Sequence, residues 1–146
     1  MKYILGIDEC STGSWAGPVY SCGVLAPEDW SFDGINDSKK LTKNQRKVLA
    51  NKLKESGVKF FISNKTSKFL DEHILGPTLK IMYNEIIDHF ENYNPEIYID
   101  GSPKKDLHGK PNFLIKGDSK LKHIMAASII GKDARDTEMA ELGKLY

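Results

Sequence analysis

Several apolar stretches of this 146-residue sequence end in acidic residues, whose carboxylates could bind metal ions or act in catalysis. Asp8 and Glu9 end one apolar run, Asp100 ends a later one, and Asp118 closely follows a third. If these runs are parallel, adjacent strands, as alternation of strands with helices favours, their C-terminal ends share the sheet edge where open α/β sheets bind ligands. We therefore expect the four carboxylates to converge.

A cluster of four carboxylates is most simply a site for divalent metal ions. Like charges that lie close together repel and raise one another's pKa unless a cation offsets them. Ligands that are all oxygen suit Mg²⁺ or Mn²⁺ rather than zinc. Two such ions about 3.5 to 4 Å apart can activate a water and stabilise the leaving oxygen of a phosphodiester, without a Ser, Cys or His nucleophile. Acids also end strands as ordinary turn residues, which is the alternative for any single one of them.

The residue pattern predicts the elements that would position these acids. Short apolar runs predict five strands, at Lys2–Asp8, Val19–Leu25, Val58–Ile62, Glu96–Asp100 and Phe113–Lys116. Three helices are expected. One runs from the capping box of Thr42 and Gln45 to a C-cap at Gly57, and one runs from about Ser119 to the region of Glu138. Between them, a helix that stops near Asn94-Pro95 has one core face, made of Leu79, Met82, Tyr83, Ile86 and Phe90. Strands that alternate with helices place the chain in the α/β class.

Length and composition predict one folded domain of residues 1–146. The chain is 40% hydrophobic and 28% charged, a balance typical of globular proteins. Its net charge of +1 provides no global field for a polyanion, so any nucleic-acid surface must be local. Cys10 and Cys22 are too few for a disulfide framework, and no stretch reaches the roughly 18 apolar residues of a membrane helix. We expect a cytoplasmic protein without a membrane partner, and take a monomer as the default.

Six short motifs resemble, in the same order, those of the ribonuclease HII family, the type 2 ribonucleases H. They are Gly6-Ile7-Asp8-Glu9, Ala16-Gly17-Pro18-Val19, Asn36-Asp37-Ser38-Lys39-Lys40-Leu41, Ile99-Asp100-Gly101, Lys116-Gly117-Asp118, and Ala126 to Lys132 with Arg135-Asp136. The resemblance implies a ribonuclease H-like fold, with a mixed five-stranded sheet flanked by helices. It also implies endonucleolytic cutting of the RNA strand of RNA–DNA hybrids, or of DNA with embedded ribonucleotides, which leaves 5′-phosphate and 3′-hydroxyl ends.

The resemblance assigns the catalytic, metal-binding roles to Asp8, Glu9, Asp100 and Asp118, with two Mg²⁺ or Mn²⁺ ions. Asp8 and Glu9 are adjacent, so in a regular strand their side chains point to opposite faces. Both can reach one site only where the strand ends or bends, and this geometry is a further prediction.

One basic segment is expected to contact nucleic acid. Ser38, Lys39 and Lys40 precede the capped helix and offer hydroxyl and ammonium donors to backbone phosphates. In the resembled family this Asp-Ser-Lys segment lies along the nucleic acid. The alternative is a solvated basic turn.

A second segment departs from the family pattern. Ser11, Thr12 and Gly13 stand where the family has Gly-Arg-Gly or Gly-Lys-Gly, which approaches the ribose 2′-hydroxyls. Loss of the cation removes a phosphate contact, and a side chain at Ser11 holds the backbone farther from the ribose. We expect these three residues to bind nucleic acid, with weaker selectivity for a single embedded ribonucleotide.

Family members usually continue, beyond the position of Tyr146, through a segment whose tyrosine stacks on nucleic acid and through a helical C-terminal extension. The sequence is therefore expected to form a catalytic domain that lacks this extension and binds its substrate more weakly. Two other functions stay open. One is a catalytically weak or inactive module that binds hybrids. The other is a phosphotransferase fragment, because Asp8 and the following Ser11-Thr12-Gly13-Ser14 are similar to the first phosphate loop of actin-like sugar kinases.

Overall fold

The five predicted strands form one mixed sheet. The computed structural model describes residues 1–10, 18–35, 41–66, 68–69 and 75–144. The strands are β1 (Tyr3–Cys10), β2 (Val19–Pro27), β3 (Lys59–Lys65), β4 (Glu96–Asp100) and β5 (Asn112–Leu114), in the order β3-β2-β1-β4-β5. The pairs β1–β2 and β2–β3 are antiparallel, whereas β1–β4 and β4–β5 are parallel. The predicted α/β class and mixed five-stranded sheet are confirmed.

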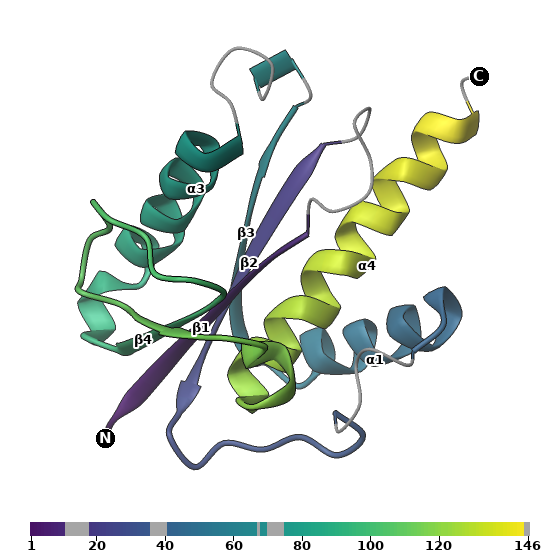
Figure 1. Ribbon diagram of the computed structural model, residues 1–146. Coiled ribbons are helices and arrows are strands. Elements are labelled where there is room, and N and C mark those ends of the chain that lie inside the picture. The colour runs from purple at the N-terminus through teal and green to yellow at the C-terminus, as the bar shows by residue number, and fades with distance from the viewer. Residues whose placement is uncertain (11–17, 36–40, 67, 70–74, 145–146) are drawn as a thin grey trace.

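Helices cover both faces of this sheet (Figure 1). Helix α3 (Leu75–His89) lies on one face, and α1 (Lys43–Glu55) and α4 (Lys122–Lys144) lie on the other. Two single-turn 3-10 helices, η2 (Glu91–Tyr93) and η3 (Gly117–Ser119), precede β4 and α4. No helix in the described ranges is long and apolar enough to cross a membrane.

The alternation of side chains along β1 decides which face each residue serves. Leu5 and Ile7 are fully buried in the core cluster that contains Tyr83 of α3. Gly6 faces the other way, because a Cβ atom there would lie 2.6 Å from the backbone carbon of His123 in α4. Asp8 shares the face of Gly6, since residues two apart in a strand point the same way. The α4 face of β1 therefore carries the first acid of the expected site.

The capping box predicted for the first helix is present. The backbone N–H of Gln45 donates to Thr42 Oγ1 at 3.1 Å, and the N–H of Thr42 donates to Gln45 Oε1 at 3.0 Å. The predicted end of this helix is wrong by one residue, because Ser56 is the C-cap and Gly57 follows it with a φ of +84°. That left-handed conformation suits glycine, which has no Cβ to clash.

Several other predicted boundaries are also wrong. The helix predicted to stop near Asn94-Pro95 ends at His89, and η2 follows it. The strand β1 does not stop at Asp8: it continues to Cys10, because its antiparallel ladder with β2 extends that far. The strand β5 ends at Leu114, short of the predicted Lys116, which has a φ of +56°. The last helix begins at Lys122 rather than near Ser119, because η3 occupies the intervening turn.

Candidate metal centre

Three of the four predicted acids meet at the carboxyl end of the parallel strands. Asp8 lies in β1, Asp100 is the last residue of β4, and Asp118 lies in η3. The parallel register pairs Ile7 with Ile99, so the two acids that follow are neighbours across β1 and β4. One carboxylate oxygen from each of the three lies within 4.8 Å of the others. This spacing lets all three bind one cation.

The turn after β5 holds Asp100 in place. The backbone N–H of Gly117 donates to Asp100 Oδ1 at 2.6 Å. Gly117 is directed there by Lys116, which adopts the left-handed conformation, and the Ser119 hydroxyl donates to the Lys116 carbonyl at 2.8 Å. A Cβ at Gly117 would lie 2.7 Å from Ile124 Cδ1, so a larger residue would force the buried Ile124 side chain or the turn to move. The same turn then places Asp118.

Asp8 is held in a buried position by its neighbours in the sheet. Its side chain is buried, and Oδ1 accepts a hydrogen bond from the N–H of Glu9 at 2.9 Å. The Ser21 hydroxyl of β2 donates to the Asp8 carbonyl at 3.1 Å, which joins the two strands at this point. Burial, followed by the negative charge of Asp100, raises the pKa of Asp8 to about 8. The protein alone therefore does not offset a negative charge on Asp8, and below about pH 8 this carboxyl is protonated.

The clustered acids suit a hard divalent cation, because their negative charges are close together and Asp8 is buried. A cation beside Asp8 would oppose both causes of its raised pKa, because it stabilises the ionised carboxylate. The three ligand atoms are carboxylate oxygens, the ligand type preferred by Mg²⁺ and Mn²⁺. Divalent metal binding is therefore the chemistry that this cluster supports.

The structure does not bring Glu9 into this cluster. Because β1 remains regular through Cys10, Glu9 has the orientation of Ile7 and lies on the α3 face. Burial raises the pKa of the Tyr83 hydroxyl of α3, and the charges of Glu9, Asp8 and Asp100 raise it further. The strand end that would let Asp8 and Glu9 share a face is absent at this point, so a metal-binding role for Glu9 stays a prediction.

The predicted nucleic-acid contacts lie outside the described residues. They are Ser11, Thr12, Gly13, Ser38, Lys39 and Lys40. The residues that follow the two segments are described: the Pro18 carbonyl accepts a hydrogen bond from Arg135, and the Leu41 carbonyl accepts one from Arg46.

Sequence reasoning missed two features of the site. It assigned Gly117 to a motif but not to hydrogen bonding with Asp100, and it placed Tyr83 only in the core. The short Lys116-Gly117-Asp118 motif was the available signal for the first. The second depends on the side that Glu9 faces, which the sequence pattern alone does not show.

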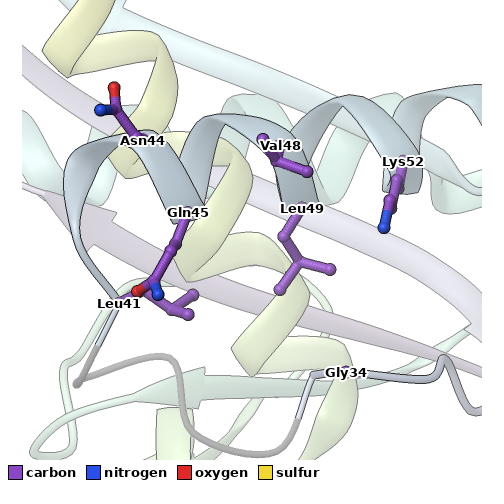
Figure 2. A pocket seen from close by; sticks show the side chains of 7 residues that line it. All are labelled: Gly34, Leu41, Asn44, Gln45, Val48, Leu49 and Lys52. Atoms are coloured by element: carbon purple, nitrogen blue, oxygen red, sulfur yellow. The ribbon is translucent and has the colours of Figure 1, made fainter.

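A pocket of about 380 Å³ lies beside α1, apart from the acidic cluster. Figure 2 shows its lining side chains, which include the amides of Asn44 and Gln45, the ammonium group of Lys52, and the apolar Leu41, Val48 and Leu49. None of the three clustered acids lines it. The candidate chemistry is therefore at the sheet edge and not in this pocket.

The family model and the similar sequences all indicate the same family. The family model described as Ribonuclease HII matches residues 5–146. Ribonuclease HII of Acetivibrio thermocellus is 38% identical over 146 residues, which are 99% of this chain and 57% of the relative. The Oceanobacillus iheyensis enzyme is 36% identical, over 99% of this chain and 55% of its own length. The Helicobacter pylori strain P12 enzyme is 37% identical, over 98% of this chain and 74% of the relative. The chain spans little more than half the length of the first two.

Solved structures show the same fold. Ribonuclease HII in its complex with PCNA from Archaeoglobus fulgidus is 30% identical, with a TM-score of 0.80 over 97% of this chain and 75% of that one. Bst-RNase HIII in complex with Mn²⁺ has a TM-score of 0.84 over 99% of this chain and 55% of that one. The latter is 20% identical, so it supports the ribonuclease H-like fold alone.

Proposed function

The chain belongs to the ribonuclease HII family, and from this premise we propose that it is a metal-dependent endonuclease for the RNA strand of RNA–DNA hybrids. The proposed substrates include DNA with embedded ribonucleotides, and the proposed products carry 5′-phosphate and 3′-hydroxyl ends. The observation that carries the proposal is the approach of Asp8, Asp100 and Asp118 to within 4.8 Å.

The three clustered acids would hold Mg²⁺ or Mn²⁺, and we propose two ions and Glu9 as the fourth acid. When bound, such ions make a water nucleophilic and stabilise the leaving oxygen of a phosphodiester. The protein's own contribution is to hold the carboxylates before substrate arrives. The Gly117 amide orients Asp100, and burial of Asp8 keeps solvent away from its carboxylate. Such preorganisation reduces the rearrangement that the reaction needs.

Nucleic-acid binding is proposed for the segments that contain Ser11, Thr12, Gly13, Ser38, Lys39 and Lys40. The net charge of +1 supports local rather than global attraction of phosphates. Lysines near the acids add to this local charge: Lys116 and Lys120 flank η3 and both are exposed. We also propose that residues 1–146 act as one catalytic domain, and keep the monomer and the cytoplasm as working assumptions.

The test is cleavage of a labelled RNA–DNA hybrid by the purified chain, with and without Mn²⁺. We expect cutting that requires the ion and is lost in Asp8→Asn, whereas DNA duplex of the same sequence stays intact. Ligation or exonuclease digestion that depends on a 5′-phosphate identifies the product ends. If no ion-dependent cutting is observed, the proposed nuclease activity is wrong. Salt-sensitive hybrid binding in that case would support the binding-module alternative, because phosphate contacts are weakened by salt.

A further inference from the structure

Two adjacent residues of α4 hold the chain at the ends of both segments proposed to bind nucleic acid. The first is Arg135, whose Nε donates to the Pro18 carbonyl at 3.1 Å. Pro18 directly follows residues 11–17 and leads into β2. The guanidinium group thereby fixes where that segment joins the sheet.

The second residue, Asp136, acts through α1. Its Oδ2 lies 2.5 Å from Nη1 of Arg46, and Nη2 of Arg46 lies 3.5 Å from the Leu41 carbonyl to which it donates. Leu41 directly follows residues 36–40. The two charged side chains are only 17% and 25% exposed, so solvent screens this pair less than a surface salt bridge. The planar guanidinium group of Arg46 binds the Asp136 carboxylate and the Leu41 carbonyl at the same time, which restricts the orientation of both.

We propose that Arg135 and Asp136 are positioning residues that set both segments relative to the metal centre. This inference rests on the proposed function, since it needs the segments to bind the hybrid. Consecutive helical residues point about 100° apart, which lets Arg135 face the start of β2 while Asp136 faces α1. The helix that carries them begins just after Asp118 and packs beneath β1, the strand of Asp8. One helix therefore links the acids to Pro18 and, through Arg46, to Leu41, the described residues that follow the two segments.

Lys47 provides a matched control, because it joins the same two helices by contacts of similar type. Its Nζ lies 3.4 Å from Thr137 Oγ1 and 4.0 Å from Asp133 Oδ1. Truncation of Lys47 removes a contact between α1 and α4 but leaves the contacts to Pro18 and Leu41 in place. An effect specific to Arg135 and Asp136 thus separates positioning from general helix packing.

The experiment compares Arg135→Ala and Asp136→Ala with Lys47→Ala in hybrid cleavage, and repeats hybrid binding in an Asp8→Asn background that does not cut. We expect KM and the hybrid Kd to rise about tenfold in the first two variants, the effect of losing one charge-assisted hydrogen bond. The Mn²⁺ affinity of the protein without nucleic acid should stay unchanged, and Lys47→Ala should keep the parent KM. Arg135→Lys and Asp136→Asn replace any truncation that fails to fold.

Amide hydrogen exchange of residues 11–17 and 36–40 gives a readout that does not depend on nuclease activity. We expect faster exchange in the segment next to each altered contact than in the parent protein. Folded variants with parent-like KM, Kd and exchange would overturn the positioning role. If the parent itself neither cuts nor binds a hybrid, the proposed function fails, and parent-like exchange in the variants would then overturn the anchoring of the segments separately.

Discussion

The backbone N–H of Gly117 donates to Oδ1 of Asp100 at 2.6 Å and joins the turn after β5 to the end of β4. The contact orients one carboxylate oxygen toward the protein backbone. Because Asp118 follows Gly117 directly, one turn controls two of the three clustered acids. The metal centre therefore depends on backbone geometry as well as on its carboxylates.

Substitution Gly117→Ala tests this dependence. The new Cβ would lie 2.7 Å from Cδ1 of the fully buried Ile124 and 3.2 Å from Leu114 Cβ, so the end of the Ile124 side chain or the turn itself must shift. We expect a loss of about 1–3 kcal/mol in the free energy of unfolding. Cleavage should fall further than the fraction of folded protein, because the shift also moves Asp100. Denaturant unfolding and cleavage rates measure the two effects.

Gly76→Ala is the matched control for that substitution. Gly76 lies in α3, and a Cβ there meets no atom within 4 Å. We expect a change of less than about 1 kcal/mol, because the site is open and the helix propensity of alanine is offset by its restriction before Pro77. Equal losses of stability in the two variants would contradict the steric explanation for Gly117.

Substitution Asp8→Asn should abolish cleavage yet stabilise the metal-free protein. The raised pKa of Asp8 means that its ionised form opposes folding, and asparagine removes that charge. Above about pH 8 we expect a gain of about 2–4 kcal/mol in the free energy of unfolding, since one pKa unit corresponds to about 1.4 kcal/mol. Thermal and denaturant unfolding without metal measure it, with the exposed Asp29→Asn as control. A less stable Asp8→Asn protein would contradict the buried-charge explanation.

The stability of the metal-free protein should depend on pH in a defined direction. The pKa of Asp8 is about 8 in the folded chain and near its ordinary value of 3.8 in the unfolded chain. The unfolded chain therefore releases the proton first, so the free energy of unfolding falls as pH rises from about 4 to about 8. Unfolding measured across this range should show that loss, and Asp8→Asn should reduce it.

The affinity for Mg²⁺ should change in the opposite direction over the same range. An ion competes with the proton on Asp8, so affinity rises with pH and levels off above about pH 8. Titration calorimetry at several pH values measures this dependence. A constant affinity from pH 6 to pH 9 would show that Asp8 does not bind the ion as a carboxylate.

Substitution Glu9→Gln separates the fourth acid from the other three. Because Glu9 does not share the cluster of Asp8, Asp100 and Asp118, we expect it to contribute less to ion binding in the free protein. Its Mg²⁺ affinity should fall by less than about threefold, against about tenfold or more for Asp8→Asn. Calorimetry of both variants decides the point. Equal losses would place Glu9 among the ligands of the free protein.

The strands, the capping box and the spacing of the acids along the chain could all be predicted from the residue pattern. These features follow from local rules: apolar runs form buried strands, and Thr42 and Gln45 satisfy backbone groups within one helical turn. The convergence of Asp8, Asp100 and Asp118 was predictable as well, because parallel strands share their carboxyl edge. The residue pattern was therefore sufficient to predict where in the fold the metal centre lies.

The orientation and the contacts of each side chain at the metal centre follow instead from the packing of the folded chain. Glu9 faces α3 because pairing with β2 keeps β1 regular through Cys10, a property of two strands and not of one. Arg135 reaches Pro18, and Asp136 reaches Arg46, across separations of 117 and 90 residues. Such contacts exist only once the sheet and helices have packed, because no local backbone preference specifies which distant groups become neighbours.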